Sequence, residues 1–368
     1  MIATFLYLDD APIDESRDKV SGLTMKDVLN VKVEQNLSEW KQQMERLKKL
    51  DYDGLILDLK LDELPVEAGQ YAGYRGTTIA QLIRDYQKEG ILKAFPMLLF
   101  TGEDNMKRAL DNTGRDLFDM IIEKGSLNMN SLQKLPGQIA ELSECYKQLN
   151  GGEDARNMIK AQGYVDDRFM DVLHTLQTED SNASCARFLL NEFVLKPGLL
   201  IDDSLLAARL GVDKDKSGRG WDAVLKLFEK ARYNGIFGES WARWWMRSVN
   251  TIWKENTGTV LQQLGAEERM VLLKKVLGCE EIEVAAKTKY AESDSFWTVC
   301  CGTGKPLDPV DGFEVMGQDT NYPWQDLQYV SKEAAFHKIK QDQWKGVATS
   351  EKERLEYLKQ QYEKKGER

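Results

Sequence analysis

The sequence predicts an open α/β fold, a doubly wound five-stranded parallel sheet, followed by a mainly α-helical domain. In the first 150 residues, short apolar runs alternate with longer stretches whose apolar residues recur three and four apart. The runs are almost continuously apolar, which is typical of strands buried on both faces of a parallel sheet. After residue 150 helical spacing dominates, and this change predicts the second, helical domain.

The expected strands are residues 4–9, 28–34, 54–59, 95–102 and 117–125. The expected helices are residues 37–50, 77–90, 104–114 and 130–149. The first helix of such a domain should fall within 16–27, but that segment contains Gly22 and has weak periodicity, so we expect a short or irregular helix. The residues NGGED at 150–154 interrupt the pattern and predict one domain at 1–150 and a second at 151–368.

The composition indicates a cytoplasmic protein with two hydrophobic cores. The chain has 368 residues, of which 42% are hydrophobic, and its net charge of −10 disfavours non-specific attraction to nucleic acid or to an anionic membrane. The N-terminal apolar stretch is too short for a signal peptide, and no run approaches the length of a membrane span. The five cysteines are expected to be reduced thiols; only Cys300 and Cys301 are close in sequence, which argues against a zinc site.

Polar residues end four of the five expected strands. Asp9 and Asp10 end the first, Asp58 the third, Thr101 the fourth and Lys124 the fifth. Because functional groups of a doubly wound sheet gather at the carboxyl ends of its strands, these side chains should converge on one rim. Carboxylates at that density suit Mg²⁺. With Mg²⁺ bound, Asp58 becomes a nucleophile toward a phosphoryl donor, while the hydroxyl and the ammonium stabilise the phosphoryl oxygens.

At these residues the first 150 positions resemble the receiver domain of two-component response regulators, which has a flavodoxin-like fold. The likeness is carried by the acidic pair in LYLDD, the aspartate in LILDLKL, the hydroxyl in LLFTGED and the lysine in IIEKGS. The resemblance implies a phosphorelay, in which a histidine kinase phosphorylates Asp58. It implies that Asp9, Asp10 and Asp58 bind Mg²⁺ and that Thr101 and Lys124 sense the phosphoryl group. Enzyme activity would be limited to self-phosphorylation and dephosphorylation.

Three features depart from that family pattern, and the first two predict that the output switch works differently. Lys124 is followed by Gly125, where the family usually has a proline, and Ile121 stands where an aromatic switch residue is usual. The segment 61–76 after Asp58 is longer than in most members. We expect this loop to cover the site or to dock a partner.

The second domain contains weaker motifs. Residues 204–238 begin like a helix-turn-helix, although the turn is longer than such motifs need. In WARWWMRSVNTIW, helical spacing places Trp241, Trp245, Val249 and Ile252 on one stripe, which favours a helix packed in the core over a nucleic-acid surface. The GTGK in residues 296–315 lacks the glycine spacing of a phosphate-binding loop, and that segment predicts two strands or a strand and a turn-rich loop.

The leading hypothesis is therefore a bacterial signalling or adaptor protein. Its receiver-like domain, through Mg²⁺-dependent phosphorylation at Asp58 or through partner docking, would control a helical domain that binds other proteins. The expected partners are a histidine kinase and an effector subunit; nucleic acid is a weaker expectation and a membrane is not expected. One alternative is a response regulator that binds DNA through residues 204–238. Another is a pseudo-receiver subunit of a bacterial stress or phage-defence complex.

Overall fold

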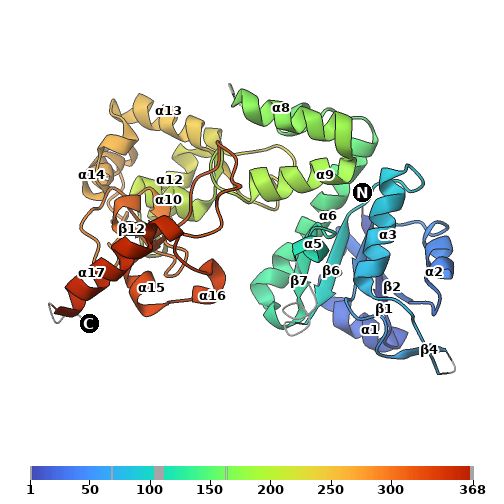
Figure 1. Cartoon of the computed structure of the whole chain (residues 1–368). Helices are drawn as coiled ribbons and strands as arrows, with labels where there is room; N and C mark the ends of the chain where they lie inside the picture. The colour runs from blue at the N-terminus through green and yellow to red at the C-terminus, as the bar shows by residue number, and fades with distance from the viewer. Residues whose placement is uncertain (1, 68, 103–111, 162, 164, 365–368) are drawn as a thin grey trace. The chain divides into compact units, whose positions relative to one another are not determined.

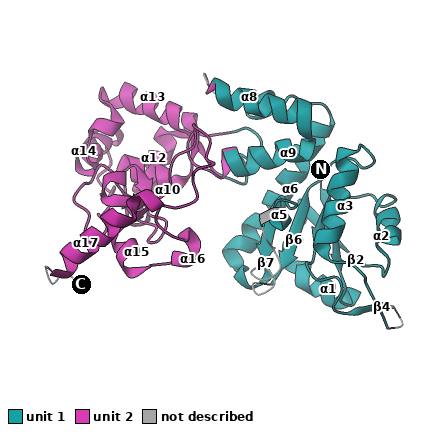
Figure 2. Cartoon of the chain, in the orientation of Figure 1, with its two compact units in different colours: residues 1–161, 167–192, 234–241 teal, residues 162–166, 193–233, 242–368 magenta. Residues whose placement is uncertain are grey.

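The structure is a computed structural model, which describes residues 2–67, 69–102, 112–161, 163 and 165–364. The chain forms two compact units (Figure 2). The first unit contains residues 1–161, 167–192 and 234–241, and the second contains residues 162–166, 193–233 and 242–368. Each unit is assembled from separate segments of the chain, so the two units do not test the predicted domain boundary near residue 150. That boundary stays a prediction.

The first unit is built on a parallel sheet of five strands, as the sequence predicts (Figure 1). The strand order is β2-β1-β3-β6-β7, and every neighbouring pair is parallel. This is the 2-1-3-4-5 order of flavodoxin-like doubly wound folds. The strands are β1 (Ala3–Asp9), β2 (Leu29–Gln35), β3 (Gly54–Leu57), β6 (Met97–Thr101) and β7 (Met120–Glu123). All five expected strands are therefore present, each within a few residues of its predicted bounds.

Helices cover both faces of this sheet. One face packs Phe5 and Tyr7 of β1 against α1 (Ile13–Val20) and α6 (Met129–Asn150), and the other packs Leu6 and Leu8 against α2 (Trp40–Leu47) and α3 (Gly76–Lys88). Successive side chains of β1 thus point to opposite, equally buried faces, which explains why the strand shows no polar alternation. The unit is completed by α5 (Asn112–Arg115), α7 (Ala155–Met158), α8 (Asp167–Thr175) and α9 (Asn182–Arg187).

The segments that connect the strands of the first unit contain short helices, turns and a small hairpin. The segment 16–27 contains the end of the eight-residue α1 and a 3₁₀ turn, Ser21–Leu23, so the expected short helix is confirmed. Helix α6 begins after Asn128, whose side chain accepts a hydrogen bond from the Ser131 amide at 3.0 Å and so caps the helix. The long segment 61–76 carries a small hairpin of β4 (Pro65–Glu67) and β5 (Gln70–Tyr71). The helix expected at 104–114 lies mostly outside the described residues.

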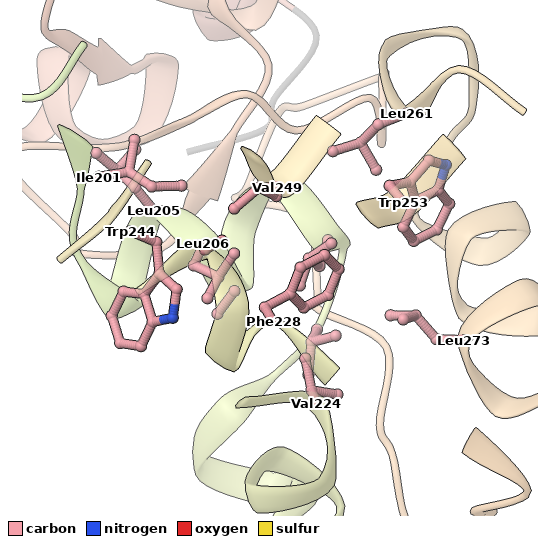
Figure 3. Close-up of a cluster of buried hydrophobic side chains, with 14 of the residues drawn as sticks. Ile201, Leu205, Leu206, Val224, Phe228, Trp244, Val249, Trp253, Leu261 and Leu273 are labelled. Carbon is pink, nitrogen blue, oxygen red and sulfur yellow. The ribbon is translucent and has the colours of Figure 1, made fainter. Parts of the chain in front are cut away.

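The second unit is mainly helical, as predicted, and it also contains small two-stranded sheets. Side chains from α10, α12, α13 and α14 converge on a central apolar cluster, with Leu206, Val224, Val249 and Leu273 all buried (Figure 3). Its helices are α10 (Asp203–Leu210), α11 (Lys214–Ser217), α12 (Arg219–Leu227), α13 (Met246–Thr257), α14 (Ala266–Leu277), α15 (Lys332–His337), α16 (Gln341–Trp344) and α17 (Lys352–Lys364). Its strands are β8 (Leu200–Ile201), β9 (Trp244–Trp245), β10 (Thr298–Val299), β11 (Pro306–Leu307), β12 (Gly312–Glu314) and β13 (Tyr329–Ser331).

The tryptophan-rich segment corrects one prediction. Helix α13 begins only at Met246, so Trp241 and Trp245 do not share a helical stripe with Val249. Trp244 and Trp245 instead pair as a short antiparallel strand with β8. All three of the tryptophans at 241, 244 and 245 are buried, so the expected core role is confirmed although the expected helix is wrong. No helix in the described part of the chain combines the length and the apolar character needed to cross a membrane.

Candidate functional site

The carboxyl ends of the parallel strands bring the predicted site residues together on one rim. Asp9 is the last residue of β1, and Asp58 directly follows β3, which pairs with β1 through Leu8 and Leu57. Thr101 is the last residue of β6 and pairs with Glu123 of β7, so Lys124 follows at the adjacent position. We call Asp9, Asp10, Asp58, Thr101 and Lys124 the rim residues.

Asp58 and Lys124 form a direct ion pair. The Lys124 Nζ donates to Asp58 Oδ2 at 2.6 Å, and it also lies 5.1 Å from the centre of the Phe100 ring. Burial raises the pKa of Asp58 above its ordinary value, and the neighbouring Lys124 opposes that rise. The lysine therefore favours the ionised form of Asp58, which is the form that acts as a nucleophile.

Thr101 supplies a hydroxyl group that has nothing to bind within the described residues. Its side chain is fully buried, and Oγ1 has no hydrogen-bond partner among them. A buried polar atom without a partner costs free energy, so its retention needs a reason. The hydroxyl lies at the end of β6, which pairs with β3, the strand that Asp58 follows.

Asp9 is surrounded by hydrogen-bond donors. Its Oδ2 accepts from Tyr7 Oη at 2.8 Å, Lys19 Nζ at 3.1 Å and Ser16 Oγ at 3.2 Å, and its Oδ1 accepts from the Ala11 amide at 3.3 Å. Burial acts to raise the pKa of Asp9, but the hydrogen bonds from Tyr7 and Lys19 outweigh it and hold the pKa below its ordinary value. Asp9 is therefore an ionised carboxylate whose charge is balanced by Lys19.

Asp10 holds the long segment 61–76 instead of facing open solvent. Its Oδ2 accepts from the backbone amides of Glu63 at 2.8 Å and Leu64 at 2.7 Å. Only 5% of the residue is exposed, and burial raises the pKa of its carboxyl group above the ordinary value while the two amides oppose that rise. The segment therefore reaches the rim, as the sequence suggests for a covering or docking loop.

The acidic residues as arranged do not fit a divalent ion. Their oxygen chemistry suits Mg²⁺. However, Lys19 and the amides of residues 63 and 64 already contact the acidic pair, and Lys124 contacts Asp58. Within the described ranges, no group of three or more His, Cys, Asp or Glu side chains is placed to hold a metal ion. Magnesium therefore stays a prediction.

A glycine allows α3 to begin directly beside Asp58. A Cβ atom added at Gly76 would lie 2.1 Å from the backbone carbonyl oxygen of Asp58. The Gly76 amide also donates to the carbonyl of Leu59 at 3.0 Å. The close approach of this helix start fixes the backbone at the carboxyl end of β3, and only glycine fits there without a shift.

Sequence reasoning missed Tyr7, Ser16, Lys19 and the two amides of residues 63 and 64. Tyr7 precedes Asp9 by two residues on the same strand, so strand alternation alone would have placed it beside Asp9. The position of Lys19 depends on how α1 turns against the sheet, and the position of the amides depends on the path of a long loop. The sequence contains no local signal for either of these contacts.

The other candidate segments have structural roles in the second unit. Both cysteines of the 300–301 pair are free thiols. The Cys300 sulfur accepts from the amides of Ser331 at 3.1 Å and Thr303 at 3.4 Å. Burial acts to raise the pKa of Cys300, but hydrogen bonds with the side chains and the amides of Ser331 and Thr303 outweigh it and lower the pKa. The contacts tie the turn between β10 and β11 to β13. Residues 296–315 contain three short strands, β10, β11 and β12, one more than the two that the sequence predicts at most.

The segment that the sequence predicts to bind DNA, residues 204–238, is divided between the two units. Residues 204–233 belong to the second unit and residues 234–238 to the first. On α12, the exposed side chains include Arg219, Asp222 and Lys226, which carry charges of both signs. A duplex-binding helix normally presents a basic face to the phosphates. DNA binding by residues 204–238 therefore stays a prediction without added support.

No protein-family model matches the sequence, and no curated protein matches it. Solved structures similar to part of the chain include the adenylate cyclase from Rhodopirellula baltica, at 14% identity over 44% of this chain and 100% of that chain, with a TM-score of 0.30. The signal receiver domain of the response regulator NarL from Mycobacterium tuberculosis matches at 18% identity over 40% of this chain and 97% of that chain, with a TM-score of 0.28.

Two similar structures are complexes. RcsB from Salmonella enterica serovar Typhimurium, bound to promoter DNA, matches at 15% identity over 50% of this chain and 86% of that chain, with a TM-score of 0.26. The response regulator TrrA, in complex with the histidine kinase ThkA, is also similar, at 20% identity over 36% of this chain and 93% of that chain, with a TM-score of 0.25. At these values the likeness carries no functional conclusion, and the fold assignment depends on the strand order of the sheet itself.

Proposed function

We propose that the chain is a signalling or adaptor protein in which the rim of the first unit is a switch centre that controls the helical second unit. The observation that carries this proposal is the fully buried Thr101 hydroxyl, which has no partner in the described residues, on the same rim as the Asp58–Lys124 pair. Together they supply a carboxylate, an ammonium and a free donor, a set suited to receiving an anionic group at Asp58.

In the proposed reaction, an ionised Asp58 oxygen attacks the phosphorus of a phosphorylated donor, such as an acyl phosphate or a phosphohistidine of a kinase. A new oxygen–phosphorus bond forms, and the bond to the donor breaks with its electron pair leaving on the donor. Lys124, which contacts Asp58 before the reaction, then neutralises a phosphoryl oxygen, and the Thr101 hydroxyl donates to another. The movement of these two side chains is the signal that the proposal passes to the second unit.

The proposed function also includes a magnesium ion and two protein partners. Asp9, Asp10 and Asp58 are the proposed metal residues, although Lys19, the Glu63 amide and Lys124 now contact their Oδ2 atoms. A histidine kinase is the proposed phosphodonor and an effector subunit the proposed recipient of the signal. Docking of a partner on the rim without phosphorylation is the second candidate, and the contact of Asp10 with the 61–76 loop favours it.

The test is intact-mass spectrometry of the full chain after incubation with acetyl phosphate, with and without Mg²⁺. We expect one phosphoryl adduct on the wild type and none on Asp58→Ala. A matched control is Asp62→Ala, which removes a nearby loop aspartate whose partner is Arg75 and should keep the adduct. An adduct that persists in Asp58→Ala, or is missing from the wild type under both conditions, would reject phosphorylation and leave partner docking.

A further inference from the structure

The side chain of Lys19 gives Asp9 an internal counter-ion. Lys19 lies on α1 with its Nζ 3.1 Å from Asp9 Oδ2 and 3.2 Å from Glu15 Oε1, and its side chain is 29% exposed. A carboxylate oxygen has two lone pairs. Oδ2 of Asp9 already accepts from Lys19, Tyr7 and Ser16, so a cation that approaches this oxygen must displace a donor.

The carboxylate of Asp10 is contacted by backbone amides of the 61–76 loop. The amides of Glu63 and Leu64 both donate to Oδ2 of Asp10, which places two partial positive charges on one carboxylate oxygen. The same loop is fastened beside the rim by the Asn36 side-chain amide, which donates to the carbonyl of Leu61 at 2.7 Å. The loop position and the charge of Asp10 are therefore parts of one arrangement.

We infer that Lys19 and residues 61–64 occupy the Oδ2 atoms of the acidic pair in place of a divalent cation, so that a cation binds at these oxygens only by displacing them. Because one Oδ2 atom cannot serve both sets of partners, cation binding at these oxygens and loop anchoring oppose each other. By linkage, each weakens the other by the same factor. The rim would then report the occupancy of its acidic pair through release of the 61–76 loop, where Leu64 and Tyr71 are already 41% and 58% exposed.

This inference relies on the proposed function only for the identity of the rim residues. It concerns cation binding in the absence of any phosphodonor. If Asp58 is not phosphorylated, the inference on cation binding still holds. If the inference on cation binding is wrong, the phosphorylation test is unaffected.

The first experiment is calorimetric titration of Mg²⁺ into the full chain, comparing the wild type with Lys19→Met. Removal of the ammonium should tighten Mg²⁺ binding at least about tenfold, since a competing charge-assisted contact is lost. Lys48→Met is the matched control, because Lys48 pairs with Glu45 at 2.9 Å in the same unit, away from the rim residues, and should change the affinity by less than about twofold. Equal affinity in the wild type and Lys19→Met would overturn the inference.

The second experiment follows the amides of Glu63 and Leu64 by hydrogen exchange in Lys19→Met, with and without saturating Mg²⁺. We expect their protection to fall on saturation, while the Asp58 amide, which donates to the carbonyl of Leu8 at 3.0 Å within the sheet, keeps its protection. Unchanged protection of both loop amides would overturn the coupling. If Lys19→Met does not fold, Lys19→Gln replaces it, because the amide side chain removes the charge but can still donate to Asp9.

Discussion

The two ends of the sheet in the first unit bury charged groups in opposite ways. At the amino ends of β6 and β7, Asp119 accepts from Arg84 at 2.8 Å, from Tyr146 at 2.7 Å and from the Met97 amide at 2.7 Å. At the carboxyl ends, acidic residues and lysines share the rim with a Thr101 hydroxyl that has no partner in the described residues. The first is a closed cluster, in which each of these donors is paired with Asp119. At the rim, by contrast, the Thr101 hydroxyl is left unpaired among the described residues.

The largest expected effect is at the closed cluster. Asp119→Ala should destabilise the protein by about 3–5 kcal/mol, because it leaves the buried guanidinium of Arg84 without its carboxylate. Asp58→Ala should change stability by less than about 1 kcal/mol, since the Lys124 side chain is 27% exposed and can turn to water. Urea unfolding of the full chain, followed by circular dichroism and by amide exchange of β6, measures both. Similar losses at the two ends would show that the rim is also a structural cluster.

The second prediction tests the backbone at the rim. Gly76→Ala should cost about 1–3 kcal/mol, because the new methyl group meets the Asp58 carbonyl and forces the helix start away from β3. It should also reduce the yield of the phosphoryl adduct, since Asp58 moves with its carbonyl. Gly73→Ala in the same loop is the control: no described atom lies within 4 Å of an added Cβ there, so stability should change by less than about 0.5 kcal/mol. A harmless Gly76→Ala would contradict the close packing at the end of β3.

The smallest expected effect comes from a matched pair of hydroxyl deletions. Tyr146→Phe removes one donor from Asp119, and Tyr7→Phe removes one from Asp9. We expect about 2 kcal/mol at the closed cluster and about 1 kcal/mol at the rim, where the partly exposed Lys19 can move closer to Asp9. Thermal unfolding of both variants compares them directly. A larger loss for Tyr7→Phe would mean that the rim is the more rigid of the two ends.

The sheet and the rim could be predicted because they follow from short-range rules. Continuous apolar runs mark strands buried on both faces, and the carboxyl ends of parallel strands meet whatever helices lie between them. Asp9, Asp58, Thr101 and Lys124 come together for this reason alone. The free hydroxyl of Thr101, by contrast, is a property of its surroundings and could not be read from its position.

The contacts that distinguish this rim could not be predicted, because they depend on how distant segments pack. Lys19 reaches Asp9 only through the rotation of α1, and Asp10 meets residues 63 and 64 only through the path of the loop. The helix predicted for the tryptophan-rich segment was wrong for a related reason. Pairing of Trp244 and Trp245 with β8 overrides their helical spacing, and this partner lies more than forty residues earlier in the chain.

The alternation of the chain between the two units has a consequence for how the protein is made. Glu141 of α6 accepts hydrogen bonds from the amides of Glu239 and Ser240, and the latter lies 99 residues later in the chain. Burial raises the pKa of Glu141, and these amides oppose that rise. During synthesis the sheet can therefore form early, but this carboxylate must wait for its partners until most of the chain has left the ribosome. A truncated product that ends at residue 150 would lack both amides, so it would be an incomplete form of the first unit.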